Sequence, residues 1–226
     1  MNLHAPTHID MIKTRTISQS KQAKVLSNIF QEKHNLAIWQ RTLPPTLLTA
    51  INAFLLSNST FSCTLAVTPD NAHSTVKEVL KRSKINVEFA NTLSEDIAEL
   101  VDMFCCLFDL KQASLRLTAL SHAMCPRFHV DKIPCRLITT YQGIATEWLP
   151  HDRVNRAALG GYRNEMSDEQ SGLYPQTEDI HQLQHGDVAL LKGERWEGNE
   201  NAGLVHRSPN LMPNEKRLLL TLDFLV

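Results

Sequence analysis

The sequence lacks an excess of charge of either sign, and it has no long basic block. Its 226 residues include 23 Lys or Arg and 24 Asp or Glu, a formal net charge of −1, and no run of Lys and Arg exceeds three residues. A nucleic-acid-binding surface normally needs a concentrated basic face. We therefore expect no nucleic acid among the partners of this protein.

Long apolar runs are also missing. The strongest one, residues 100–108, contains an aspartate and is about half as long as a bilayer-spanning helix. No basic start followed by an apolar stretch marks a signal peptide. The five cysteines are an odd number without the spacing of a small disulfide-bonded scaffold, which favours reduced thiols. These absences predict a cytoplasmic protein that does not bind a membrane.

The first half of the chain has mainly helical patterns. Residues 1–25 are polar without apolar periodicity and predict a loose N-terminal tail. Residues 26–112 form a mainly helical part, because apolar residues recur at three- and four-residue spacing over 26–56, after Pro69 and from about residue 92 to 108. Within this part, 61–67 and 85–89 are predicted to be extended. Cys105 and Cys106 are predicted to pack in the core.

From residue 113 the apolar period changes from that of a helix to that of a strand. Predicted strands lie at 114–120, 129–141, 145–149, 180–183, 188–191, 203–209 and 217–225. Two irregular loops, at 150–179 and 193–203, are long enough to be functional. We therefore predict an α+β fold in which a barrel or jelly roll over 113–226 is backed by the N-terminal helices, as one compact domain.

Three residues in the second half are candidate metal ligands. His129 and Asp131 are two residues apart, so in an extended segment both side chains project to the same side. His206 lies in another predicted strand. Two imidazoles and a carboxylate are the ligands of a facial-triad metal site. A second His-x-Asp, at His8 and Asp10, shows that the tripeptide alone carries little information.

The last predicted strand has two different faces. Its even positions are all apolar and suit packing against helices: Leu218, Leu220, Leu222 and Phe224. Arg217, Leu219, Thr221 and Asp223 take the other face and would project into a cavity of mixed polarity. A buried guanidinium rarely lacks an anionic partner. That partner is expected to be a substrate carboxylate or Asp223.

This order of residues resembles the double-stranded β-helix of the 2-oxoglutarate- and iron(II)-dependent oxygenases. The resemblance covers residues 113–226, and its elements are His129-Val-Asp131, the Gly186-Asp187 turn, His206 and Arg217. It implies that His129, Asp131 and His206 bind Fe(II) and that Arg217 pairs with the distal carboxylate of the co-substrate 2-oxoglutarate. The implied activity is hydroxylation of an unknown substrate, which the loops at 150–179 and 193–203 would present.

One position departs from that family. Leu219 stands where many of these oxygenases have a serine, so one hydroxyl contact to the co-substrate is missing. Tyr141 is a candidate to supply a hydroxyl instead, and Arg136 is an alternative anchor for an anion. Arg207 is a weaker candidate because it should face away from His206.

The residues around the site also resemble a bacterial family of unknown function. Its members are often encoded beside zinc-handling GTPase metallochaperones, which implies a functional link to these GTPases. One alternative function is therefore a cupin-like protein that binds zinc or iron in metal homeostasis without oxygenase activity. Another is a non-enzymatic interaction module with a degraded site.

Several other side chains allow further interpretations. Cys125 and Cys135, with His122 or His129, would make a softer zinc site. His181 and His185 have the spacing to chelate a metal on a helix, although the Gly-Asp that follows favours a surface turn. Trp148 is predicted to be a core anchor. Trp196 is predicted to lie in a loop at the mouth of the site.

Overall fold

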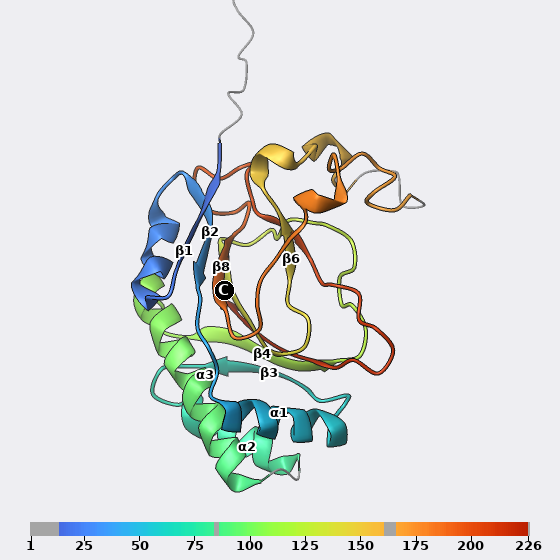
Figure 1. Ribbon diagram of the computed structural model, residues 1–226. Coiled ribbons are helices and arrows are strands. Elements are labelled where there is room, and N and C mark those ends of the chain that lie inside the picture. Colours follow the sequence, from blue (N-terminus) through green and yellow to red (C-terminus); the bar gives the residue numbers. More distant parts are fainter. Residues whose placement is uncertain (1–13, 84–85, 161–165, 226) are drawn as a thin grey trace, which may run out of the picture.

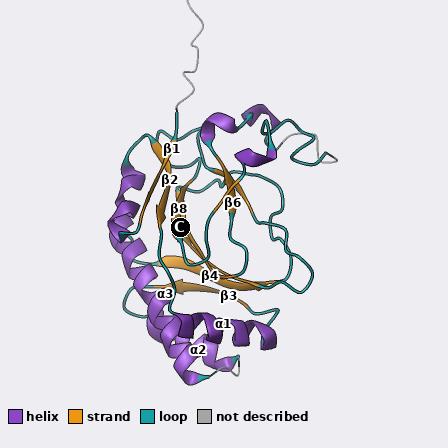
Figure 2. Ribbon diagram, viewed as in Figure 1, coloured by secondary structure: helices purple, strands orange, loops and turns teal. Residues whose placement is uncertain are grey.

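The computed structural model describes residues 14–83, 86–160 and 166–225. Three α-helices and two sheets make up most of this part of the chain (Figures 1 and 2). In chain order the elements are β1 (Thr16–Ser20), η1 (Ala23–Phe30), β2 (His34–Trp39), α1 (Pro45–Ser57), β3 (Ser62–Val67), α2 (Ala72–Arg82), α3 (Val87–Phe108), β4 (Ala113–Leu120), β5 (Cys135–Gln142), β6 (Glu147–Leu149), η2 (His151–Arg153), η3 (Arg156–Ala158), η4 (Thr177–Asp179), β7 (His181–Gln182), β8 (Val188–Lys192), β9 (Val205–Arg207) and β10 (Arg217–Phe224).

The strands form one large and one small sheet. The large sheet has the order β1-β2-β8-β5-β10-β4-β3, and the small sheet has the order β7-β6-β9. β10 lies between β5 and β4 in the larger sheet and is antiparallel to both. The three α-helices cover the outer side of the large sheet, and β6 lies on its inner side (Figure 1). The predicted mixture of helices and strands, with β structure concentrated after residue 113, is confirmed.

The two faces of β10 are divided as predicted. Leu218, Leu220 and Leu222 are buried in the core that the large sheet forms with the helices. Leu219 belongs to a second core, on the inner side, together with Trp148 of β6. The side chains of β10 that do not face the helices therefore point into the space between the two sheets.

The predictions for the first part of the N-terminal half are wrong at two places. The expected loose tail over residues 1–25 does not hold from residue 16, because β1 pairs in parallel with β2 at the edge of the large sheet; residues 1–13 lie outside the described part. The expected helical pattern over 26–56 is interrupted by β2. All but the last residue of β2 are buried, so the strand shows no alternation of apolar and polar residues.

Helix α3 begins earlier than its pattern predicted. The side chain of Asn86 caps the helix by accepting a hydrogen bond from the backbone N–H of Glu88 at 2.8 Å. Residues 87–89, predicted to be extended, are therefore helical. Asp109, with φ of 52°, ends the helix in a left-handed conformation. Cys105 is buried as predicted, whereas Cys106 is exposed. Among the described helices, none is both long and apolar enough to span a membrane.

Lys192, at the end of β8, makes the stability of the fold depend on pH. It is only 2% exposed, its Nζ donates to the backbone oxygen of Gln31 at 3.1 Å, and it lies 4.7 Å above the Trp196 ring. Burial, with Arg15 nearby, lowers the pKa of Lys192 from 10.5 to about 8. The buried charge costs stability below pH 8, and the cost is relieved as the folded protein loses that proton between pH 8 and 10.5.

We therefore expect Lys192→Met to be more stable than the wild type at pH 7.5, and the difference to shrink by roughly 3 kcal/mol by pH 10.5. Urea unfolding of both proteins at several pH values measures it. Comparing the two proteins cancels the titration of tyrosines and cysteines in the same range. Parallel stability curves for the two proteins would contradict the assignment.

Candidate metal centre

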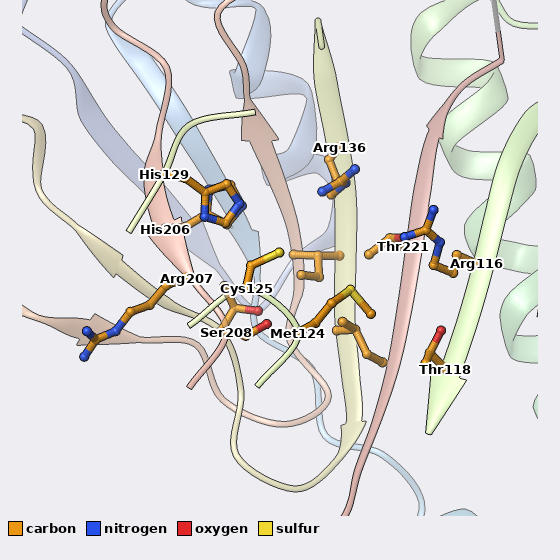
Figure 3. Close-up of a pocket in the computed structure, with 13 residues that line it drawn as sticks. Arg116, Thr118, Met124, Cys125, His129, Arg136, His206, Arg207, Ser208 and Thr221 are labelled. Carbon is orange, nitrogen blue, oxygen red and sulfur yellow. The ribbon is translucent and has the colours of Figure 1, made fainter. Parts of the chain in front are cut away.

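The structure brings His129, Asp131 and His206 together. His129 precedes β5 and forms an isolated antiparallel bridge with His206 of β9, in which each backbone N–H donates to the other residue's oxygen at 3.0 Å. Their ring centroids are 4.6 Å apart (Figure 3). One ligand atom from each histidine and one from Asp131 all lie within 4.8 Å of one another. His206 thus meets His129 and Asp131, which lie 77 and 75 positions earlier in the chain.

Each imidazole is oriented by its backbone. Nδ1 of His129 lies 2.9 Å from the oxygen of Arg127, and Nδ1 of His206 lies 3.2 Å from the oxygen of Leu204. Because a carbonyl oxygen can only accept, both Nδ1 atoms carry the hydrogen. Each Nε2 therefore presents a lone pair, the arrangement found in metal-binding histidines. The Nε2 atoms of His129 and His206 lie 3.9 and 3.5 Å from the Asp131 carboxylate.

The electrostatics also suit a cation. His206 is 5% exposed, and burial lowers its pKa to about 4 against the opposing effect of Asp131, so the ring is neutral at pH 7. Oδ2 of Asp131 is buried and accepts no hydrogen bond from any residue that the structure describes. Arg136 Nη1 lies 2.9 Å from it as an ion pair, but outside hydrogen-bond angles. Two imidazoles, each with its Nε2 toward the carboxylate, and this carboxylate oxygen fit a divalent transition-metal ion.

Arg217 lies beside the same site without an anionic partner. It is 1% exposed, and its Nη2 donates to the hydroxyls of Thr140 at 3.0 Å and Thr146 at 2.7 Å. Its Nη1 is buried and has no hydrogen-bond partner among the described residues. Burial lowers the pKa of Arg217 to about 10. Thr146 also lines the pocket that contains the two histidines. The guanidinium therefore has an unsatisfied donor and is joined through Thr146 to the pocket that contains the two histidines.

Asp223 is not the partner of Arg217. Both of its carboxylate oxygens accept from Arg136, at 2.8 and 2.9 Å. Arg136 lines the pocket, but Asp131 and Asp223 already pair with its charge. Arg136 as an alternative anion anchor stays a prediction, and in this structure its guanidinium pairs with Asp131 and Asp223.

Tyr141 does not supply the predicted hydroxyl at the site. Its side chain is fully buried on the helix side of the large sheet, and its hydroxyl donates to Asp96 of α3. Alternation along β5 puts the preceding residue, Thr140, on the inner face opposite Leu219. The hydroxyls near the guanidinium of Arg217 are thus those of Thr140 and Thr146, which the sequence analysis did not select. Thr146 precedes a short strand and carries no recognisable signal.

The other candidate ligands do not assemble. Cys125 is exposed and lines the pocket, whereas Cys135 is buried on the helix side, where burial raises its pKa, so the predicted cysteine-containing zinc site is wrong. His181 lies in β7, stacked on Trp148, and His185 lies in the turn that follows, as favoured over a chelating helix.

Trp148 is a core anchor as predicted. Trp196 instead packs against Phe30 and Phe108 on the helix side, away from the pocket. Arg207 pairs with Glu147 and Asp168 and points away from the pocket (Figure 3).

The two irregular loops hold the metal ligands in place. The carboxylate of Asp168 accepts from the backbone N–H of Phe128 at 2.9 Å, next to His129. In the second loop, the N–H of Glu194 donates to the backbone oxygen of Asp131 at 3.0 Å. A side chain at Gly193 would place its Cβ 2.1 Å from the oxygen of Ile133, so only glycine fits. Both loops therefore buttress the segment that carries His129 and Asp131.

Comparisons with known proteins support a shared fold. A family model described as "Protein of unknown function (DUF1826)" matches residues 20–223. The structure of dioxygenase for auxin oxidation 1 from Arabidopsis thaliana, a 2-oxoglutarate complex, is 7% identical with a TM-score of 0.50, covering 94% of this chain and 92% of that chain.

The rice dioxygenase for auxin oxidation is 12% identical with a TM-score of 0.49, covering 85% of this chain and 74% of its own. A Pseudomonas putida prolyl-4-hydroxylase is 12% identical with a TM-score of 0.43, covering 89% and 97%. At 7% identity the Arabidopsis structure shows a similar fold alone. No curated protein matches the sequence.

Proposed function

The chain belongs to the DUF1826 family, and we propose that it is a non-haem, Fe(II)- and 2-oxoglutarate-dependent oxygenase built on a double-stranded β-helix. The observation that carries the proposal is that His129, Asp131 and His206 converge next to Arg217, a buried guanidinium without an anion. A buried guanidinium without an anionic partner lowers the stability of the folded protein, and a bound anion would offset this loss. A dicarboxylate co-substrate that also binds the metal satisfies both groups at once.

In this proposal each residue has a defined task. His129, Asp131 and His206 hold Fe(II), which when bound supplies the activation of dioxygen and the oxidation of a C–H bond, coupled to decarboxylation of 2-oxoglutarate. Arg217 receives the distal carboxylate of 2-oxoglutarate through its free Nη1. The hydroxyls of Thr140 and Thr146 hold the guanidinium plane in place.

The residues around the ligands maintain their orientation. The backbone oxygens of Arg127 and Leu204 fix the two imidazole rings, and Arg136 fixes the carboxylate of Asp131. Burial of His206 keeps it neutral, so a proton does not compete with the metal at neutral pH. Such outer contacts normally change metal affinity or activity by about 10–100-fold when removed.

The direct test is the formation of succinate from 2-oxoglutarate by the untagged protein supplied with Fe(II) and air. Oxygenases of this kind turn over slowly without their substrate, so we expect succinate in proportion to time and enzyme. An anaerobic titration of the Fe(II) protein with 2-oxoglutarate should give a new visible absorption band. A tightly held metal on which 2-oxoglutarate has no effect would instead favour the metal-homeostasis alternative, and no bound metal would favour an interaction module.

Two neighbouring residues of β5 provide a matched pair of variants for the titration. Thr140→Val removes a hydroxyl that contacts Arg217, and we expect it to raise the Kd for 2-oxoglutarate about tenfold while metal binding is unchanged. Tyr141→Phe removes a hydroxyl on the helix side, and we expect unchanged 2-oxoglutarate affinity with a loss of about 1 kcal/mol of stability. The reverse pattern would place the co-substrate elsewhere.

A further inference from the structure

The pocket at the candidate metal centre extends to a part of the large sheet that the proposed chemistry does not use. Beyond His129 and His206 it is lined by Arg116 and Thr118 of β4 and by Thr221 of β10. Arg116 and Thr118 are two residues apart on one strand, and Thr221 is the cross-strand neighbour of Arg116. Figure 3 shows them across the pocket from the histidines, with Met124 and Cys125 between.

The charge along this pocket is one-sided. Among the described residues that line it, none is acidic and three are arginines. Arg136 is paired with Asp131 and Asp223, and Arg207 is paired with two other carboxylates. Arg116 forms no ion pair or hydrogen bond with any described residue. Both oxygens of Asp223, the nearest carboxylate along β10, already accept from Arg136. Arg116 is exposed at the edge of this pocket and is the lining arginine that no described carboxylate pairs with, so it is open to an anion from solution.

On the proposed function, the metal and the co-substrate leave the positive charge of Arg116 without a negative partner. The two charges of Fe(II) balance those of 2-oxoglutarate. The charges of Arg136 and Arg217 balance those of Asp131 and Asp223, and a histidine that ligates the metal is uncharged. One positive charge, on Arg116, remains at the far end of the pocket. A substrate with a single negative charge would neutralise it.

Apolar side chains separate this cation from the metal ligands. Met124, Ile138 and Leu219 line the same pocket between the two ends. A ligand that reaches from Arg116 to the metal ligands would thus have an apolar segment where it contacts these three side chains. We propose that the substrate is a small organic monoacid, whose carboxylate binds Arg116 and the hydroxyls of Thr118 and Thr221, and whose apolar segment lies over Met124, Ile138 and Leu219.

Binding of simple probes tests this proposal without turnover. Hexanoate and hexanamide have the same chain and differ in charge, so we expect the Fe(II) and 2-oxoglutarate-loaded protein to bind hexanoate about tenfold more tightly under anaerobic calorimetry at low salt. Arg116→Gln, which keeps a hydrogen-bonding side chain, should abolish that preference. Thr221→Val should weaken hexanoate a few-fold. Hexyl phosphate is a third probe, which distinguishes a carboxylate site from a phosphate site.

Arg82→Gln, an exposed arginine at the end of α2, is the matched control and should bind hexanoate as the wild type does. Equal binding of hexanoate and hexanamide, no hexanoate binding, tighter binding of hexyl phosphate, or an unchanged preference in Arg116→Gln would each overturn the proposal. Titrating metal-free protein with hexanoate and hexanamide separates the two proposals. If the protein binds neither metal nor 2-oxoglutarate but still prefers hexanoate through Arg116, only the oxygenase proposal fails. If it binds metal and 2-oxoglutarate but shows no preference for hexanoate, only the monoacid proposal fails.

Discussion

Replacing His206 with alanine is expected to lower the affinity of the protein for Fe(II) by at least about 100-fold and to abolish succinate formation. The substitution removes one of three ligands, and nothing near it can take its place: within the described residues these three form the one group of His, Cys, Asp and Glu side chains close enough to share an ion. The same loss is expected for zinc or nickel, because the donor set and not the metal defines the site. Metal analysis after equilibrium dialysis measures it.

The backbone around His206 should survive the change. Its N–H and oxygen pair with His129 whatever the side chain, and the side chain contributes one hydrogen bond, to Leu204. A melting temperature within a few degrees of the wild type would therefore separate lost ligation from unfolding. His185→Ala, in an exposed turn, is the control and should bind metal normally. Full metal content in His206→Ala would refute the site.

The residues that the sequence analysis placed correctly share one property: their position follows from local alternation. In an extended segment His129 and Asp131 must share a side, and the apolar even positions of β10 must face the helices. Those two facts are enough to bring Arg217 onto the inner face. Where alternation was absent, as in the fully buried β2, the strand was mistaken for helix.

What could not be predicted depends on pairing between distant strands. The choice between Thr140 and Tyr141 is decided by the register of β5 against β10, which shifts by one residue at Leu218. Likewise, Arg136 takes Asp223 only because β5 and β10 lie side by side and bring residues 87 positions apart into contact. Sequence spacing alone left Asp223 available to Arg217, and the structure removes that possibility.

Replacing Arg217 with methionine is expected to have opposite effects on function and stability. The guanidinium is buried with no carboxylate, and burial lowers its pKa to about 10, so the folded protein bears the cost of an uncompensated charge. An apolar side chain of similar length removes that cost. We therefore expect the free energy of unfolding to increase by about 1–2 kcal/mol and the melting temperature to rise with it. The affinity for 2-oxoglutarate should fall by at least about 100-fold, because its distal carboxylate loses a buried cationic partner.

Arg136→Met is the matched control, because Arg136 lies near the same ligands but is already paired. Removing it leaves Asp131 and Asp223 without their cation, so this variant should be less stable than the wild type. Thermal melts with and without 2-oxoglutarate test both variants together. Wild type should gain stability from 2-oxoglutarate in the presence of metal, whereas Arg217→Met should start higher and gain nothing. If Arg217→Met is instead less stable and still stabilised by 2-oxoglutarate, then Arg217 supports the fold and the co-substrate binds elsewhere. A gain in stability from losing a buried arginine is the result expected when that arginine serves a ligand and not the fold.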